Sequence, residues 1–381
     1  MIVQGRMLGT HLIVNVSTEG DVITSVEPAD RRTVPDRGGP DLYLCEGFFD
    51  PQVNGYVGVD FNGKDLTGER FHKAARSLAA SGVTRFLPTL ITASYERLAK
   101  QLVIIADTLE NDPLVKTMCP GIHMEGPYIS PEDGPRGVHP RDFIRPPSWD
   151  EVERLQEACR GHIRCMTLAP EVEGAIPFIE KATERGIVIG LGHTNASDEI
   201  LEDAFRAGAR LSSHLGNAAP ALFPRYGNPI QKQLSMDGLM ASIIVDGIHL
   251  PGHAVKNYIR TKGTEWVLLT TDSMAGAAAP AGRYTLGDLE VEVNPVDRSA
   301  RLLGTSRLAG STLTMDQAIA HVIRFSGVDL ATAVQMAGQN GEKLFAELGR
   351  GLVPGCPANL VLFEYSGEVI IKDTWINGEK I

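Results

Sequence analysis

The sequence predicts an α/β protein: a (β/α)8 TIM barrel with a small β-sandwich domain made from both chain ends. Eight short apolar runs each end in polar residues, and amphipathic stretches of helical periodicity lie between them. The two ends of the chain carry strand and turn patterns without a helix. At 381 residues the chain is long enough for one barrel, which commonly takes about 250 residues, and a smaller appended domain.

The eight candidate strands are nearly continuously apolar before their polar tips, as parallel strands covered on both faces should be. They lie within residues 48–55, 84–92, 121–128, 163–171, 187–195, 210–217, 241–249 and 266–273. Between strands, apolar residues recur every three or four positions in segments such as 67–82, 94–112, 176–186 and 197–208. Alternating strands and helices predict a parallel sheet, and eight units favour a closed barrel over an open doubly wound sheet, the alternative fold.

The chain ends predict the second, smaller unit. Strand-like segments occupy residues 22–28 and 41–47, and the tail from 351 to 381 has strand and turn signals only. We therefore expect residues 1–47 and 350–381 to pair in a small β domain, and residues 48–349 to form the catalytic barrel. A long loop rich in Pro and Gly, 126–147, follows the third strand, and such loops are more often functional than idle.

Composition excludes several classes of partner. The formal net charge of -11 opposes binding to nucleic acid or to anionic lipid, because both require a basic surface. No segment has the apolar length that a membrane span needs. The amino terminus lacks the features of a secretory signal, so we expect a cytoplasmic location. The five cysteines are odd in number and show no CxxC spacing, which indicates reduced thiols.

Four polar strand tips are candidates for chemistry, because the reactive groups of α/β barrels lie at the carboxyl ends of strands. Glu125, His193, His214 and Asp272 end the third, fifth, sixth and eighth strands. Singly, each is more often a structural or solvated residue, but four at one end of a barrel favour a site. Two imidazoles and a carboxylate suit a divalent metal with an open position for water. Asp272 would take a proton from that water and pass it to a leaving amine, as in a metal-dependent hydrolase.

The remaining histidines are weighed individually. His123 lies two residues before Glu125 and faces the same side, and we expect it to be a hydrogen-bonded residue deeper in the barrel. His249 ends the seventh strand and faces the mouth, which favours a role in substrate binding. The histidines in helical or peripheral segments are interpreted as structural: His11, His72, His162, His253 and His321.

The order and spacing of several segments resemble the amidohydrolase superfamily, and within it the N-acetylglucosamine-6-phosphate deacetylase family. The resemblance covers nearly the whole chain, and it is carried by GFFDPQVNG, GIHMEGPYIS, LGHTNAS, SSHLGNAAP, DGIHL, TTDSMAGAAAPAG, LAGSTLTMD and LVPGCPANLVLFE. It implies hydrolysis of an N-acetyl group from an amino-sugar phosphate, most simply N-acetylglucosamine 6-phosphate.

The resemblance also implies the metal content. Most amidohydrolases have an HxH pair at the end of the first strand that supports a second metal, whereas this chain has Gln52 and Asn54 there. Some deacetylases of the family carry the same QxN sequence and use a single metal. One divalent ion per chain is therefore expected on Glu125, His193 and His214, with zinc first and iron or another divalent ion as alternatives.

The family's substrate residues are implied where the motifs match. Asn217, the backbone amide of Ala218 and His249 would bind phosphate. Arg225 lies where the family has a phosphate-binding arginine that reaches the neighbouring subunit's active site, so a homodimer is implied. His139, in the loop after the third strand, matches a histidine that helps to polarise the acetyl carbonyl.

Two departures from the family pattern concern the substrate. The segment 222–234 around Arg225 differs, and Gly216 replaces an aromatic residue. Alternative substrates are N-acetylgalactosamine 6-phosphate or an N-acyl amino acid. An alternative of another class is a non-catalytic scaffold on the same fold, although a scaffold has no need of an open metal position.

Overall fold

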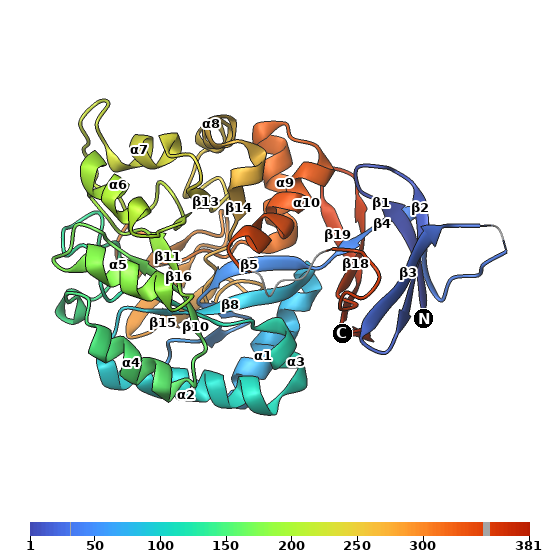
Figure 1. The fold of residues 1–381 in the computed structure, drawn as a ribbon, viewed down its shortest axis with the longest axis horizontal. Coiled ribbons are helices and arrows are strands. Elements are labelled where there is room, and N and C mark those ends of the chain that lie inside the picture. The colour runs from blue at the N-terminus through green and yellow to red at the C-terminus, as the bar shows by residue number, and fades with distance from the viewer. Residues whose placement is uncertain (31, 346–350) are drawn as a thin grey trace.

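The computed structural model describes residues 1–30, 32–345 and 351–381, and its centre is a barrel of eight parallel strands (Figure 1). The strands hydrogen bond in sequence order, as the predicted fold requires. They are β5 (Phe48–Val53), β8 (Val83–Ile91), β9 (Ile122–Glu125), β10 (Ile163–Leu168), β11 (Val188–Leu191), β12 (Leu211–Ser212), β13 (Met240–Ile243) and β14 (Val267–Leu269). All eight lie within or next to the predicted segments, and the barrel prediction is confirmed.

Contacts between the first and eighth strands close the barrel. Val53 at the end of β5 forms a parallel bridge with Ser273, which lies beyond β14. The buried carboxylate of Asp50 on β5 accepts hydrogen bonds from the Thr270 hydroxyl at 3.1 Å and from the Thr271 amide at 3.2 Å. These bonds join residues about 220 positions apart and connect the first strand of the barrel to the segment that follows the last.

Helices surround the barrel on its outer side (Figure 1). They are α1 (Gly68–Leu78), α2 (Tyr95–Asn111), α3 (Pro113–Met118), α4 (Trp149–Ala158), α5 (Ala175–Glu184), α6 (Asp198–Arg206), α7 (Pro229–Ser235), α8 (Gly252–Lys262), α9 (Met315–Ser326) and α10 (Leu330–Met336). Short 3-10 turns are η1 (Ala79–Ser81), η2 (Arg141–Phe143), η3 (Thr264–Trp266) and η4 (Gln339–Lys343). The four helices expected from periodicity are present, and Ser94 illustrates how they begin: its hydroxyl accepts the Arg97 amide ahead of α2.

The interior of the barrel is apolar at one level and polar at the other. A separate hydrophobic cluster takes one residue from each of six barrel strands, together with Phe345: Phe49, Leu87, Cys165, Leu211, Met240 and Leu268. Residues contributed by strands around the whole ring must point into the barrel, as the interior layers of TIM barrels do. This layer fills the barrel beneath the strand ends and leaves the carboxyl ends to polar side chains.

The two chain ends join in one seven-stranded sheet beside the barrel, where both termini lie (Figure 1). Its strands are β1 (Ile2–Met7), β2 (Ile13–Glu19), β3 (Val22–Pro28), β4 (Arg37–Glu46), β18 (Leu360–Tyr365), β19 (Val369–Ile376) and β20 (Glu379–Lys380). The amino- and carboxyl-terminal parts meet where β4 pairs with β18. Both parts contribute to a small hydrophobic core, which includes Val14, Val16, Leu362 and Trp375. The expected boundary at residues 349 and 350 lies outside the described residues.

An insertion after β14 was not expected from the sequence. It forms a three-stranded antiparallel sheet of β15 (Gly282–Leu286), β16 (Leu289–Val293) and β17 (Ala300–Leu302). A smaller pair, β6 (Gly55–Tyr56) and β7 (Val59–Asp60), follows β5. The alternating segment around Gly287 and Asp288 is the sequence signal for a hairpin that could have revealed the insertion. Among the described residues, no helix has both the length and the apolar character needed to cross a membrane.

Candidate active site

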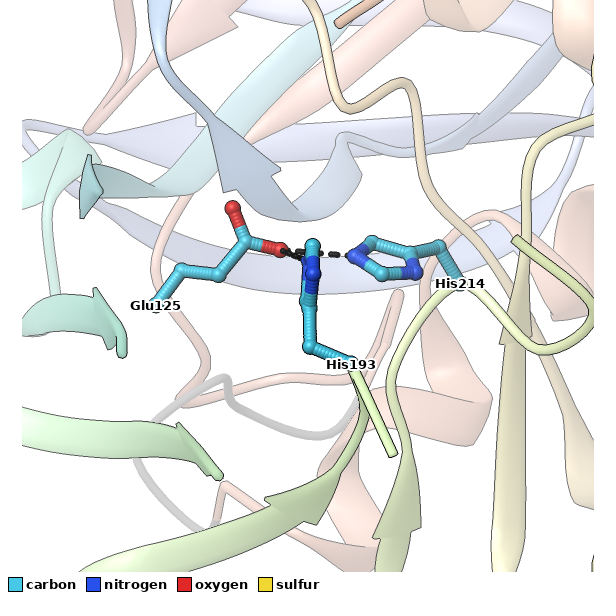
Figure 2. A group of neighbouring side chains, drawn as sticks. All are labelled: Glu125, His193 and His214. Carbon is cyan, nitrogen blue, oxygen red and sulfur yellow. Dashed lines mark hydrogen bonds and ion pairs between the residues drawn. The ribbon is translucent and has the colours of Figure 1, made fainter. Parts of the chain in front are cut away.

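Glu125, His193 and His214 converge at the carboxyl ends of β9, β11 and β12 (Figure 2). The Oε1 atom of Glu125 lies 3.1 Å from Nε2 of His193 and 2.6 Å from Nε2 of His214. All three side chains are buried, and one potential ligand atom from each lies within 4.8 Å of the others. Three residues that are far apart in the sequence thus direct their polar atoms to one point.

The backbone at these positions is unusual. His193, His214 and Asp272 have φ values of 52°, 31° and 48°, in the left-handed region that residues other than glycine seldom adopt. Ala218, with φ 46°, shares this conformation. Strain of this kind persists where the surrounding structure imposes it, and it is common at functional sites. The sharp turns at the strand ends aim these side chains across the barrel mouth.

The tautomer of His193 shows that the three residues fit a cation. The Nδ1 atom of His193 lies 2.9 Å from the carbonyl oxygen of Pro135, which can only accept a hydrogen bond, so Nδ1 carries the proton. In the neutral ring, Nε2 then presents a lone pair to the Glu125 carboxylate, and two acceptors facing each other call for a cation. In addition, Nδ1 of His214 is buried without a hydrogen-bond partner among the described residues. This arrangement fits a divalent metal ion.

The charges of the cluster are strongly coupled. Burial favours the neutral form of Glu125, but hydrogen bonds with His139, His193 and His214 outweigh burial and hold the pKa of Glu125 well below its usual range. Burial and the neighbouring His139 lower the pKa of His193 to about 4, so this ring is neutral near pH 7. Burial disfavours the charge of His214, but the hydrogen bond to Glu125 and the charge of Glu125 raise the pKa of His214 to about 9, so a proton is held between these two residues. A metal ion binds a carboxylate and neutral imidazoles, so its binding would displace that proton.

Asp272 lies beside the cluster and is held by two amides. The Oδ1 atom of Asp272 accepts hydrogen bonds from the Gln52 amide at 2.9 Å and from the Asn54 amide at 2.7 Å. The Gln52 amide also donates to Oε1 of Glu125 at 2.8 Å, so it bridges two buried carboxylates. Sequence reasoning identified Gln52 and Asn54 as poor metal ligands but missed this role. Because both amides donate to Oδ1, Oδ2 is left to face the pocket.

His139 reaches the same cluster from the long loop after β9. Its ring lies against that of His193, with 4.4 Å between the centroids, and its Nε2 lies 3.7 Å from Oε2 of Glu125. Nδ1 of His139 lies 2.8 Å from the Thr92 hydroxyl, which can donate to it, and the backbone amide of Thr92 donates to the same atom at 3.4 Å. A ring that accepts a hydrogen bond at Nδ1 carries its proton at Nε2 when neutral. His139 can therefore donate a hydrogen bond into the pocket.

The pocket above these residues has a volume of about 440 Å³ and is lined by the predicted phosphate-binding group as well. Asn217, Ala218 and His249 all line it. Oδ2 of Asp246 lies 2.7 Å from Nδ1 of His249, and the same side chain accepts the backbone amide of His249 at 2.8 Å. This carboxylate orients the imidazole and leaves Nε2 as its second polar atom.

The sequence singled out Arg225, but two other arginines line the pocket. Arg225 is exposed in the loop before α7 and does not line the pocket of its own chain. Arg301 and Arg307 do line it, from the insertion that sequence reasoning missed. His123 is buried and bonded to the carbonyl oxygen of Pro51 and the hydroxyl of Thr167, as expected for a residue deeper in the barrel.

Comparison with solved structures defines the class of protein. The chain superimposes with a TM-score of 0.90 and 28% identity on N-acetyl-D-glucosamine-6-phosphate deacetylase from Mycobacterium smegmatis. That structure is an Asp-to-Ala variant in complex with N-acetyl-D-glucosamine-6-phosphate, and the match covers 100% of this chain and 98% of that one. Enamidase, a member of the amidohydrolase superfamily, shares the fold with a TM-score of 0.58 and 14% identity, covering 100% of this chain and 95% of that chain. The chain thus has the fold of the amidohydrolases.

Curated relatives define the family. N-acetylglucosamine-6-phosphate deacetylase from Bacillus subtilis (strain 168) is 31% identical over 340 residues, which are 87% of this chain and 83% of the relative. N-acetylgalactosamine-6-phosphate deacetylase from Escherichia coli O157:H7 is 31% identical over 362 residues, 94% and 92% of the two chains. No family model matches the chain. The chain belongs to the N-acetylglucosamine-6-phosphate deacetylase family.

Proposed function

We propose that this enzyme hydrolyses the N-acetyl group of N-acetylglucosamine 6-phosphate, giving glucosamine 6-phosphate and acetate. The observation that carries the proposal is the convergence of Glu125, His193, His214 and Asp272 in one pocket. The activities for which the relatives are named support the substrate class, since both are deacetylases of amino-sugar phosphates. A non-catalytic scaffold is disfavoured, because it would need neither the ligand cluster nor an oriented carboxylate beside it.

One divalent cation per chain would be held by Glu125, His193 and His214. When bound, the cation would polarise the acetyl carbonyl and make a water molecule easier to deprotonate. Imidazole and carboxylate ligands suit zinc first, while iron and other divalent ions remain chemically compatible with the same ligands. The Pro135 carbonyl fixes the tautomer of His193.

Asp272 is proposed as the group that moves the proton. Its Oδ2 atom would accept a proton from the attacking water as the water oxygen bonds to the acetyl carbon. Its Oδ1 atom stays fixed by the amides of Gln52 and Asn54 during this step. Asp272 would then return the proton to the sugar nitrogen as the carbon–nitrogen bond breaks, so that the amine leaves neutral and the carboxylate is regenerated.

His139 is proposed to stabilise the negative charge that develops on the acetyl oxygen. Its Nε2 proton can be donated to that oxygen, because the Thr92 amide donates to the opposite nitrogen. Donors already in place before the reaction stabilise such charge most effectively. His139 is buried and packs on His193, which limits reorientation of the ring.

The phosphate would bind at the opposite end of the pocket, to Asn217, the backbone amide of Ala218 and His249. Asp246 supports this assignment, because its hydrogen bond to Nδ1 of His249 would keep the other ring nitrogen directed at the ligand. The left-handed backbone of Ala218 presents its amide at a sharp turn, a geometry that backbone anion sites often use.

A homodimer is proposed, with Arg225 of each chain reaching the active site of the other. Arg225 is exposed and lies apart from the pocket of its own chain. Two exposed large side chains flank it, Leu222 at 90% and Tyr226 at 81% exposure. Apolar side chains that are this exposed are typical of a surface that a partner covers, and a guanidinium beside them can meet two phosphate oxygens.

The cell compartment and the domain division are also proposals. All five cysteines are free and four are buried, which is typical of the reducing cytoplasm. Residues 1–47 with 350–381 would form the small β domain, and residues 48–349 the catalytic barrel. The pairing of β4 with β18 supports this division.

The test is acetate release from N-acetylglucosamine 6-phosphate by purified protein of measured metal content. The unphosphorylated sugar and the galacto epimer are assayed beside it, since a relative of 31% identity acts on N-acetylgalactosamine 6-phosphate. Activity restricted to the phosphorylated gluco sugar, with about one metal ion per chain, is the expected outcome. Activity only on the galacto epimer would change the substrate, and activity only on N-acyl amino acids would exclude a phosphate site.

A further inference from the structure

The insertion formed by β15, β16 and β17 ends in a segment that is attached to the catalytic strand end. The Ser311 amide donates to the carbonyl oxygen of Asp272 at 2.8 Å, and the Met274 amide donates to the carbonyl oxygen of Ser311 at 2.9 Å. Two backbone hydrogen bonds therefore fix the return of the insertion directly beside Asp272. The residues just before Ser311 must lie over the mouth of the barrel.

The beginning of the insertion is attached to a different part of the barrel. Oδ2 of the buried Asp60 accepts hydrogen bonds from the Thr285 hydroxyl at 2.9 Å and from the Gly287 amide at 2.8 Å. Further along, the Arg298 guanidinium donates to the carbonyl oxygen of Ala279 at 2.8 Å. Contacts at both ends hold the insertion in one position relative to the pocket.

Within the insertion, a turn after β17 directs Arg307 toward the pocket. The Leu302 amide donates to the carbonyl oxygen of Arg307 at 2.9 Å, and the Arg301 guanidinium donates to that of Ser306 at 2.6 Å. Arg307 itself is exposed and lines the pocket together with Asn217. Within the described part of the chain, its guanidinium has neither a hydrogen-bond nor an ion-pair partner, although such groups usually find one.

Arg307 lies near the rim that carries the predicted phosphate-binding turn. Gly134 and Arg307 line the same pocket, and the charge of Arg307, after those of Arg136 and Arg141, contributes to lowering the pKa of the neighbouring Asp133. The next residue, Gly134, packs so closely on the loop after Ala218 that an added Cβ would lie 2.9 Å from the carbonyl oxygen of Ala219. Arg307 therefore lines the same pocket as Gly134, Asn217 and Ala218.

The negative charge of the pocket calls for an additional cation where phosphate binds. Two carboxylates, Glu125 and Asp272, lie at the base, and the chain as a whole has a formal net charge of -11. A phosphate monoester that approaches this pocket is repelled unless cations at the mouth compensate. Arg301 uses its guanidinium to hold the turn, with bonds to Ser299 and Ser306, whereas Arg307 has no such structural task.

We propose that Arg307 binds the phosphate of the substrate from within the same chain, as a second guanidinium in addition to Arg225 of a neighbouring subunit. The proposal rests on the proposed function for its substrate, but the chemistry it names is simply a phosphate monoester. Arg307 makes each chain able to hold phosphate by itself, and Arg225 adds to this in a dimer.

The experiment compares Arg307→Met with the wild-type enzyme. Methionine retains an unbranched apolar stem at an exposed position, so folding is expected to be unaffected. The kcat/KM for N-acetylglucosamine 6-phosphate should fall about 10- to 100-fold, the value of one charge-assisted hydrogen bond, mainly through KM. The kcat/KM for the unphosphorylated sugar should stay within about twofold, because the lost charge serves only the phosphate. Arg307→Lys should recover part of the loss.

The matched control is Arg141→Met, which removes an arginine 3.6 Å from the same Asp133 without removing a pocket side chain. It should change KM by less than about threefold. An equal loss of kcat/KM in both variants would show that Arg307 acts only by adding positive charge near the pocket, and not by contacting the phosphate. A wild-type KM in Arg307→Met, or an equal loss on both sugars, would overturn the proposal.

Binding of inorganic phosphate separates this inference from the proposed function. Titration calorimetry of the metal-loaded proteins should show weaker phosphate binding in Arg307→Met than in the wild type, about tenfold or more. If the wild type binds phosphate through Arg307 but releases no acetate, the proposed function fails and the inference stands. If acetate is released and phosphate binding is the same in both proteins, the inference alone fails.

Discussion

Replacement of Asp272 by asparagine tests the proposed proton transfer with little change of shape. Oδ1 of Asp272 accepts two amide hydrogen bonds, so an asparagine should turn its carbonyl oxygen to Gln52 and Asn54. Its NH2 group would then take the place of Oδ2, which faces the pocket. This group can neither accept the proton of a water molecule nor return it to the amine. The substitution should therefore leave the site assembled and remove the proton transfer.

The expected loss of turnover is about 10²- to 10⁴-fold, the usual contribution of a positioned acid–base group, or about 3–5 kcal/mol in activation free energy. Stability should not fall. Burial and the charge of Glu125 raise the pKa of Asp272 to about 7, which shows that its charged form is disfavoured in the folded protein. A neutral amide removes that unfavourable charge.

The assay is kcat for acetate release, together with metal content and the thermal midpoint of each protein. Asp316→Asn is the matched control, because burial also raises the pKa of Asp316 but this residue lies outside the pocket. The control should keep wild-type turnover. The reasoning would be refuted by Asp272→Asn turning over within about tenfold of the wild type. It would also be refuted if that variant lost its metal, since Asp272 would then be a ligand.

Three further predictions follow from other parts of the molecule. His193→Asn should bind little metal. Chelation should lower the thermal midpoint of the wild type by several degrees and leave the thermal midpoint of the variant unchanged. An equal effect of the chelator on both proteins would show that His193 is not a ligand. Burial raises the pKa of Asp60 to about 7, despite hydrogen bonds that favour its charge. The stabilising effect of protonated Asp60 is therefore full below about pH 4 and is lost as the pH rises toward 7. The free energy of unfolding, measured by denaturation, should therefore fall less steeply between pH 4 and 7 in Asp60→Asn than in the wild type. Replacement of Leu222 and Tyr226 by serine should shift sedimentation from dimer to monomer without changing far-UV circular dichroism, and an unchanged dimer would place the interface elsewhere.

Local sequence pattern determined the strands of the barrel. Each barrel strand is a short apolar run with a polar tip, and each strand end could be located because burial on both faces leaves a continuous signal in the sequence. The polar tips Glu125, His193 and His214 could be placed at one mouth because parallel strands in a barrel share one carboxyl end. The tail strands could be recognised from strand and turn signals, although the pairing of β18 with β4 needed the structure.

Tertiary structure alone decided how the polar atoms meet. Gln52 and Asp272 are 220 positions apart, and nothing local to either residue indicates that their side chains share a hydrogen bond. The insertion after β14 brings Arg307 over the pocket through contacts with Asp272 and with the barrel at Asp60, and its position depends on all of these at once. Sequence periodicity reports burial, which is a local property, whereas the geometry of a site depends on the packing of distant segments.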